Sequence, residues 1–427
     1  MSKKLNAIAV DLTPILPGGD NGGAKIFVIE LLYHLARIAP QVRFILLTRN
    51  VSHDELAILD YPNMRREMVT DLPEIISPPS RLLIYSSKLV SKLPGRLHWI
   101  ANRIVNKIFR PVEKARFGSL LRDMDADLLF CPFTAPIYYD PGITTVSVIY
   151  DLQFRTYPEF FSEDDLLQRQ NSFTEACQKA DALSAISNHS RNDAIAHGNL
   201  DPNRIRTIYI RMNQSFLSDT KDEHALLSRS GLMKKRYLLY PANFWKHKNH
   251  EMLLTAFNLA CHQGLAKDIK LVCTGEPGER QKWLMNASLA MGLENRVIFP
   301  GFIPNTELSI FLNNCCGLIF PSLFEGFGIP VIEAMSAGVP VACSNVTSLP
   351  EVAGDAALFF DPRVPNQVAK AMISIVEDKP LREQLINDGR KRAVEFSDTE
   401  QMAREYLELF HTSLLNTRKK KHGRISR

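Results

Sequence analysis

The sequence predicts an α/β protein built from two doubly wound domains that face a cleft. Segments typical of strands and helices alternate in both halves of the chain. A polar stretch without a strand pattern, residues 212–235, separates the halves. With 427 residues, 45% of them apolar, the chain is long enough for two cores. We therefore expect one domain over residues 1–212 and a second over 236–398.

The first half opens on an apolar run followed by a glycine-containing loop and an amphipathic segment. We expect that segment, residues 26–39, to form a helix. Short apolar runs bounded by polar or turn residues predict the strands. In the first half they lie at residues 6–12, 43–48, 128–131, 145–150 and 182–186. In the second half they lie at 237–240, 269–274, 297–300, 318–321, 339–343 and 357–360.

Two glutamates stand eight residues apart after the predicted strand at 318–321. Glu325 falls in the turn that follows the strand, and Glu333 about one turn into a helix marked by Pro330 near its beginning. Ligands of open α/β sheets bind at the carboxyl ends of strands, where helix N–H groups favour phosphate. Gly326 and Gly328 would let the backbone approach such a ligand, and a carboxylate in the helix can accept hydrogen bonds from ribose hydroxyls. The alternative is a pair of solvated surface glutamates.

A second polar segment, P-A-N-F-W-K-H-K-N-H from residue 241, also follows a strand and precedes a helix. It therefore belongs to the same end of the predicted sheet. Lys248 stands there as a candidate partner of phosphate, and a solvated lysine is the alternative.

These motifs resemble the E-x7-E signature of the retaining, nucleotide-sugar-dependent glycosyltransferases of family 4, which have the GT-B architecture of two Rossmann-like domains. The resemblance extends to P-S-L-F-E-G-F-G, A-M-S-A-G-V-P-V and S-L-P-E-V-A-G-D, and is specific over residues 237–363. The overall likeness is to bacterial mannosyltransferases that build O-antigens and other surface polysaccharides.

The resemblance implies roles for the residues of the second domain. Glu333 would bind ribose, Lys248 the diphosphate, and Glu325 the sugar, together with the turn Gly326, Phe327 and Gly328. Asn243 stands where the family has an arginine, five residues before Lys248. An asparagine can donate a hydrogen bond to phosphate but brings no charge, so the charge rests on Lys248, with Lys246 as a second candidate.

In the first domain, the resemblance singles out two pairs of residues. Gly22 and Gly23, before the first helix, match a glycine pair that approaches the phosphates and the acceptor. Tyr150 and Asp151 stand where many relatives have His-Asp. Tyr150 keeps a hydrogen-bonding group but lacks a base that titrates near neutral pH. Asp151 remains a candidate for positioning the acceptor hydroxyl, which makes Glu325, Asp151 and Tyr150 the expected catalytic residues.

No metal and no cofactor are expected. Asp123, Asp125 and Asp127 form a D-x-D pattern, but they precede a strand and so lie at its amino end, away from the predicted site. His247 and His250 lack further ligands nearby in the sequence. The seven cysteines show no paired metal spacing and read as reduced core residues.

The sequence has no apolar run of membrane-spanning length, so we expect a cytoplasmic protein. Basic residues recur at helical spacing over residues 96–110, beside an apolar face, as in helices that lie on anionic membranes; a solvated helix face is the alternative. The resemblance also implies a last helix, at 399–417, that crosses back to the first domain. Residues 418–427 form a basic tail, which could be a solubilising end or a contact to an anionic surface. No nucleic-acid partner is expected.

The function implied is metal-independent transfer of one sugar, with retention, from a nucleotide diphosphate sugar to a hydroxyl of a growing lipid-linked or surface polysaccharide. Mannose from GDP-mannose is the first candidate, and UDP-glucose, UDP-galactose and deoxyhexose donors stay open. The alternatives are a nucleotide-sugar epimerase on a similar scaffold and a non-catalytic nucleotide-sugar-binding partner in polysaccharide assembly.

Overall fold

The computed structural model describes residues 5–18, 21–69, 120–212 and 223–425. Contacts divide the chain into two compact units. Unit 1 comprises residues 1–148, 172–184 and 403–427, and unit 2 comprises residues 149–171 and 185–402. The basic segment at residues 96–110 lies outside the described residues.

The first sheet has seven strands in the order β3-β2-β1-β4-β5-β6-β7. β1 pairs in parallel with both β2 and β4. The sequence did not predict the strands β3 and β7, because neither is an apolar run: β3 reads M-R-R-E-M, and charges are common on an edge strand. The strands are β1 (Ala7–Asp11), β2 (Arg43–Thr48), β3 (Met64–Met68), β4 (Leu128–Cys131), β5 (Thr144–Ile149), β6 (Ala182–Ala185) and β7 (Ile205–Thr207).

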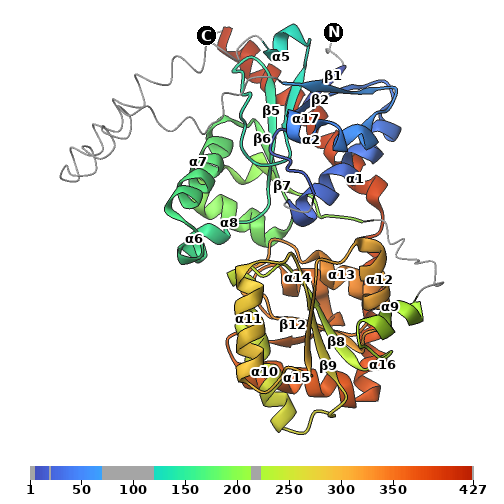
Figure 1. The fold of residues 1–427 in the computed structure, drawn as a ribbon. Coiled ribbons are helices and arrows are strands. Elements are labelled where there is room, and N and C mark those ends of the chain that lie inside the picture. Colours follow the sequence, from blue (N-terminus) through green and yellow to red (C-terminus); the bar gives the residue numbers. More distant parts are fainter. Residues whose placement is uncertain (1–4, 19–20, 70–119, 213–222, 426–427) are drawn as a thin grey trace, which may run out of the picture. The chain divides into compact units, whose positions relative to one another are not determined.

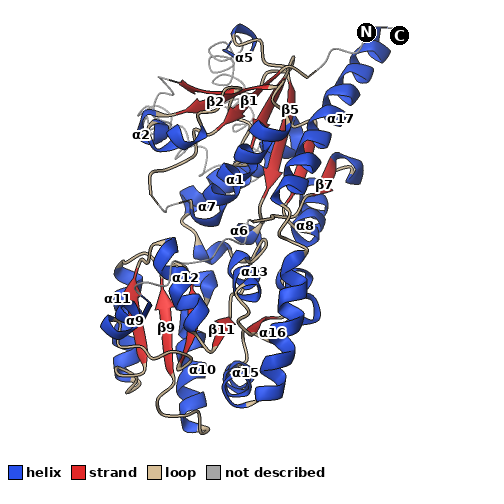
Figure 2. Cartoon of the chain, turned by 90° about the vertical axis from the view of Figure 1, so that its right-hand side faces the viewer, coloured by secondary structure: helices blue, strands red, loops and turns tan. Residues whose placement is uncertain are grey.

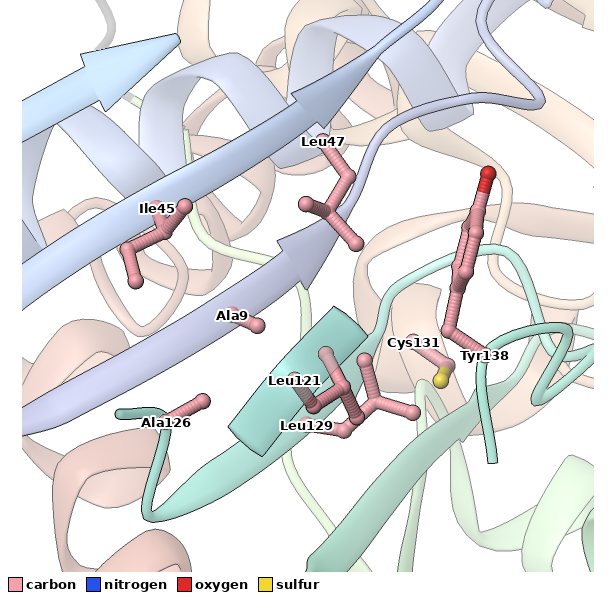
Figure 3. Close-up of a cluster of buried hydrophobic side chains, with 8 residues drawn as sticks. All are labelled: Ala9, Ile45, Leu47, Leu121, Ala126, Leu129, Cys131 and Tyr138. Carbon is pink, nitrogen blue, oxygen red and sulfur yellow. The ribbon is translucent and has the colours of Figure 1, made fainter. Parts of the chain in front are cut away.

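One face of this sheet carries a cluster of buried side chains from β1, β2 and β4 (Figure 3). Alternate residues of each strand, such as Ala9, Leu47 and Leu129, point to this face, as the two-residue period of a strand requires. The helices in this part of the chain are α1 (Gly22–Ile38), α2 (Asn50–His53), α5 (Leu120–Asp123), α6 (Gln153–Thr156), α7 (Glu163–Lys179) and α8 (Asn188–Gly198), with short 3-10 turns at Glu55–Leu59, Pro158–Phe160 and Pro202–Arg204.

The last helix, α17 (Thr399–Ile425), contributes aromatic side chains to the core of unit 1. The Tyr406 and Phe410 rings are fully buried and lie 5.6 Å and 5.0 Å from the ring of Phe130 on β4. The Tyr406 hydroxyl also lies 3.1 Å from the Ser184 hydroxyl on β6. The helix continues through most of the segment that the sequence suggested as a separate basic tail.

The second sheet has six parallel strands in the order β10-β9-β8-β11-β12-β13. All six lie where the sequence predicted strands, because each is a short, mainly apolar run; the four inner strands are almost fully buried, and the edge strands β10 and β13 are partly exposed. The strands are β8 (Tyr237–Pro241), β9 (Lys270–Thr274), β10 (Val297–Gly301), β11 (Gly317–Phe320), β12 (Val341–Ser344) and β13 (Leu358–Phe360).

Helices flank this sheet, with α10 packed on α15 and α13 packed on α16 (Figures 1 and 2). A glycine suits the close approach of α13 and α16, because a Cβ at Gly389 would lie 3.1 Å from the Met335 side chain, which would have to shift slightly. The helices are α9 (Glu223–Arg229), α10 (His250–His262), α11 (Glu279–Ala290), α12 (Asn305–Asn314), α13 (Ile329–Ser336), α14 (Leu349–Ala353), α15 (Pro365–Glu377) and α16 (Lys379–Val394), with 3-10 turns at Lys246–Lys248 and Gly354–Ala356.

The strand order places two loops side by side. From β8 the chain proceeds outward through β9 to β10, and from β11 it proceeds outward in the other direction. β8 and β11 therefore meet at the point where the order reverses, the usual place for a ligand in an open α/β sheet. The loop after β8 carries Lys248, and the loop after β11 carries Glu325.

Two further observations complete the fold. Helix α1 begins at Gly22, one turn earlier than the sequence predicted, so Gly22 and Gly23 are its first residues and not part of the preceding loop. Among the residues that the structure describes, no helix is both long and apolar enough to cross a membrane.

Candidate functional site

The loop after β8 is held by its own backbone and by one buried asparagine. Asn249 adopts a left-handed conformation (φ 62°) between the 3-10 turn that contains Lys248 and helix α10. Its side-chain amide donates hydrogen bonds to the carbonyl oxygens of Pro321 and Pro362. The Leu323 N–H donates to the His247 carbonyl at 2.7 Å. These bonds fasten the Lys248 loop to the loop that follows β11.

The loop after β11 needs two glycines, for different reasons. Gly328 precedes α13 with φ 101°, which strains any other residue. Gly326 has no such backbone angle, but a Cβ there would lie 2.6 Å from the carbonyl oxygen of Tyr150. The sequence suggested that both glycines serve close approach to a ligand; in this structure Gly326 allows close approach to the chain's own Tyr150.

Glu325 and Lys248 form an ion pair between the two loops. The Lys248 Nζ donates to Glu325 Oε1 at 2.6 Å, although 77 residues separate the two in sequence. The side chains are 14% and 12% exposed. The backbone of Glu325 is held as well, because its N–H donates to the Thr347 hydroxyl and its carbonyl accepts from Ser348. The pair thus joins a cation and an anion of little exposure at the reversal point of the sheet.

Glu333 lies on α13 in a half-buried position. Burial raises the pKa of its carboxyl to about 7. None of the described residues donates a hydrogen bond to that carboxylate. A half-buried acceptor of this kind is suited to a ligand that brings its own hydroxyl groups.

Asp151 lies within electrostatic reach of the ion pair. Burial raises the pKa of its carboxyl, the hydrogen bond from the Gln153 N–H and the charge of Arg169 lower it, and the nearby Glu325 raises it again. Tyr150 contributes its backbone, since its carbonyl oxygen accepts from the Ser190 hydroxyl at 2.6 Å. Unit 2 therefore brings Asp151, Glu325 and Lys248 together.

Two of the predicted residues use their side chains within the protein. The Asn243 side-chain oxygen accepts from the Glu276 N–H at 2.9 Å, which ties the loop after β8 to the loop after β9. The Phe327 ring is buried against Phe396, so only the backbone of Phe327 can face a ligand. Gly22 and Gly23 lie in unit 1, at the beginning of α1, where the buried Lys25 donates to the Leu16 and Gly18 carbonyl oxygens.

Three residues at the site have no role in the sequence prediction. Thr347 and Ser348 hold the Glu325 backbone, as described above, and Ser348 also donates to the Phe327 carbonyl. The Glu351 carboxylate accepts from the backbone N–H groups of Asn188 and His189 at the start of α8. Ser348 and Glu351 belong to the S-L-P-E motif, so the motif marked them, but nothing local in the sequence shows which distant backbone groups they bind.

The two histidines beside Lys248 are held neutral. Burial lowers the pKa of His247 to about 2 and that of His250 to about 3, and the charge of Lys248 adds to both shifts. No group of three metal-ligating side chains occurs within the part of the chain that the structure describes. Asp127 of the D-x-D pattern accepts from the Asn6 and Ala7 N–H groups at the amino end of β1, which confirms its expected place away from the ligand end.

Known proteins resemble this chain in sequence. Residues 226–392 match the family model described as glycosyl transferases group 1. The O-antigen chain mannosyltransferase B of Escherichia coli is 29% identical over 307 residues, which cover 71% of this chain and 80% of that protein.

Solved structures share the fold at low sequence identity. The sucrose-phosphate synthase of Thermosynechococcus elongatus superposes with a TM-score of 0.71 at 19% identity, over 95% of this chain and 98% of that one. HepE of Anabaena, in complex with UDP and glucose, gives a TM-score of 0.67 at 16% identity, over 95% of this chain and 100% of that one. This chain therefore has the GT-B fold, and its residues 226–392 match the model of the glycosyl transferases group 1 family.

Proposed function

We propose that this protein is a retaining glycosyltransferase that moves a sugar from a nucleotide diphosphate sugar to a hydroxyl of a growing glycan. The observation that carries the proposal is the meeting of Lys248 and Glu325 at the reversal point of the second sheet, with Glu333 on the following helix. A cation and two carboxylates in this arrangement match a ligand that has one anionic part and two parts rich in hydroxyl groups.

Lys248 would hold the diphosphate. The loops that carry Lys248 and Glu325 are fastened to each other, so its ammonium stands close to where charge develops on the departing phosphate and can stabilise that charge. The exposed Lys246, two residues earlier, is the second candidate cation, while Asn243 adds a hydrogen bond without charge. A lysine that stabilises the leaving group supports a reaction that needs no metal.

The two glutamates would hold the sugar and the ribose. Glu333, which lacks a hydrogen-bonding partner among the described residues, would accept from the two ribose hydroxyls. Glu325 and the backbone of the turn at residues 326–328 would bind sugar hydroxyls. Asp151, near Glu325, would position the acceptor hydroxyl, with Tyr150 beside it.

The reaction would be a substitution on one face of the sugar. The acceptor oxygen bonds to the anomeric carbon on the face from which the phosphate departs, and the departing phosphate oxygen takes the acceptor proton. This route retains the anomeric configuration. It needs no carboxylate nucleophile of the kind used by retaining glycoside hydrolases.

The first candidate donor is GDP-mannose, and the first candidate acceptor is a lipid-linked surface polysaccharide. The support is the 29% identity with an O-antigen chain mannosyltransferase. Such an acceptor places the protein in the cytoplasm, at the inner face of the cell membrane. The basic segment at residues 96–110 is the proposed contact to that surface.

The test is transfer by the purified protein from GDP-mannose, UDP-glucose and UDP-galactose to a lipid-linked glycan extract, with the anomeric configuration of the product read by NMR. We expect one donor to react, with retention, and activity to persist in EDTA. Lys248→Met should abolish transfer, whereas Lys267→Met, at an exposed lysine of the same unit, should leave it unchanged.

Three outcomes would overturn parts of the proposal. Conversion of a donor to its epimer without acceptor would show an epimerase. Binding of a donor without any turnover would show a non-catalytic nucleotide-sugar-binding protein. Loss of transfer in EDTA that a divalent metal restores would contradict the metal-independent route.

A further inference from the structure

The Lys248–Glu325 ion pair has a consequence for which ligands the site prefers. Both side chains have low exposure, and at 2.6 Å the pair is a charge-assisted hydrogen bond. Under the proposed function, however, each member binds a different part of the sugar donor: Lys248 the diphosphate and Glu325 the sugar. A phosphate or a sugar hydroxyl that replaces the bond between Lys248 Nζ and Glu325 Oε1 leaves the other member of the pair in need of a new partner.

The backbones of Lys248 and Glu325 are held by hydrogen bonds, so their side chains are the part of the site that can change position. The backbone at Lys248 is held by the Tyr240 hydroxyl, which donates to the Lys248 carbonyl at 2.7 Å. The backbone at Glu325 is held by Thr347 and Ser348. With both backbones anchored, a change of partner requires only that the two side chains turn apart. The Phe320 ring lies 5.6 Å from the Lys248 Nζ in the pair as it stands in the structure.

We propose that the Lys248–Glu325 pair acts as an exchange switch that makes the site prefer the intact sugar donor to the nucleoside diphosphate product. This inference rests on the proposed function and deepens it. When an intact donor binds, its phosphate pairs with Lys248 and its sugar hydroxyls donate to Glu325. Both members of the ion pair therefore gain a new partner.

A nucleoside diphosphate satisfies only one member. Its phosphate takes Lys248 but leaves the Glu325 carboxylate, only 12% exposed, without its cation and close to the phosphate charge. A carboxylate of low exposure without a partner is costly, and like charges in such a place repel. When transfer removes the sugar, Glu325 therefore returns to Lys248 and displaces the diphosphate. The ion pair promotes product release.

The inference is tested with Glu325→Gln, which has nearly the same shape but cannot form the ion pair. Because Lys248 is then free for phosphate, GDP and inorganic pyrophosphate should bind about tenfold more tightly than to the unmodified protein, the effect of roughly one net hydrogen bond. Guanosine, which has no phosphate, should bind both proteins equally. The matched control is Glu383→Gln, which removes the same charge from an exposed pair with Lys379 and should leave all affinities unchanged.

A second measurement needs no variant. In the unmodified protein, without acceptor, GDP-mannose should bind about tenfold more tightly than GDP, and Glu325→Gln should erase that preference. If UDP-sugars prove to be the donors, UDP, uridine and the reacting UDP-sugar take their places.

The outcomes separate the inference from the proposed function. If transfer occurs, the inference is overturned when Glu325→Gln binds diphosphate no more tightly than the unmodified protein, or when donor and product bind the unmodified protein equally. If the unmodified protein neither transfers a sugar nor binds any nucleotide, the proposed function fails and the inference fails with it.

Discussion

At the scale of single residues, Glu333 couples nucleotide binding to protons. Its carboxyl has a pKa raised to about 7 by burial, so about half of the molecules carry the proton at neutral pH. Ribose hydroxyls that donate to the carboxylate favour its ionised form and lower its pKa. Nucleotide binding at pH 7 should therefore release protons, up to about half a proton for each site. Calorimetric titration in two buffers of different ionisation enthalpy measures this number.

The control for that prediction is Glu333→Gln, which has no proton to release. It should also bind nucleotide and nucleoside more weakly, by about tenfold, because an amide is a weaker acceptor than a carboxylate. Equal proton release by the variant and the unmodified protein would assign the titration to another group and remove Glu333 from the ribose site.

The same carboxyl predicts a pH-dependent stability. The unfolded chain loses this proton near pH 4.5 and the folded chain near pH 7, so the folded state binds the proton more tightly. The free energy of unfolding therefore falls as the pH rises from about 4.5 to about 7, and then stays level. Glu333→Gln lacks this loss. We expect the variant to be more stable than the unmodified protein at pH 8, by on the order of 1–3 kcal/mol, with only about a quarter of that difference present at pH 5.

Urea unfolding at pH 5 and pH 8 tests the expectation, since other titrating groups cancel between the two proteins. A stability difference that is the same at both pH values would show that the Glu333 carboxyl is not desolvated. A gain in stability accompanied by a loss of nucleotide affinity would identify Glu333 as a residue kept for binding at a cost in stability.

At the scale of elements, the site depends on the fastening of the loops after β8 and β11, and Asn249 is central to it. Asn249→Gly keeps the left-handed backbone but loses both hydrogen bonds to the Pro321 and Pro362 carbonyls, which should destabilise the protein by about 1–3 kcal/mol. Asn249→Ala should cost roughly 1 kcal/mol more, because alanine also strains the left-handed conformation. Both variants should weaken nucleotide binding.

Denaturant unfolding of the two variants separates the contribution of the Asn249 hydrogen bonds from that of its left-handed backbone. Nucleotide titration measures the effect of each variant on the ligand site. Equal stability of the glycine and alanine variants would show that the backbone relaxes away from φ 62°. Unchanged nucleotide affinity in both would mean that the loop carrying Lys248 keeps its place without Asn249.

The elements also show what the sequence can and cannot predict. All six strands of the second sheet were predicted, because buried parallel strands are apolar throughout and bounded by turn residues. The turn that carries Glu325 was predicted because it follows one of these strands. The helix that carries Glu333 was predicted because Pro330 marks its beginning. The edge strand β3 was not predicted, since its polar sequence lacks the pattern.

Contacts over long sequence distances were beyond local patterns. The ion pair of Lys248 with Glu325 joins two loops whose proximity depends on the strand order. The contact of Gly326 with the Tyr150 carbonyl, and the bonds of Glu351 to the start of α8, likewise depend on how distant segments meet. The motif singles out these residues, and only the fold shows what they touch.

At the scale of the whole molecule, α17 completes the core of unit 1 from the far end of the chain. Phe410 is fully buried against Phe130, so Phe410→Ala should lower the free energy of unfolding by about 3–5 kcal/mol. Leu415→Ala, on the same helix at a side chain that is 47% exposed, should change it by less than about 0.5 kcal/mol. Urea unfolding followed by circular dichroism measures both.

Nucleotide binding should be unaffected by either change, because Lys248 and Glu333 belong to unit 2. Calorimetric titration below the unfolding transition checks this. A large loss of nucleotide affinity in Phe410→Ala would show that the ligand site depends on the core of unit 1.

The position of α17 in the sequence has a consequence for how the protein is made. A ribosome completes β1 to β5 long before it reaches Tyr406 and Phe410, so during most of synthesis Phe130 lacks the aromatic rings that cover it in the finished molecule. The second sheet emerges in the meantime and, because its six strands come from one continuous stretch of chain, it can form first. Until α17 is made, the apolar face of the first sheet around Phe130 is exposed and can bind chaperones. A stalled or truncated chain would keep this face exposed, and we expect such chains to aggregate.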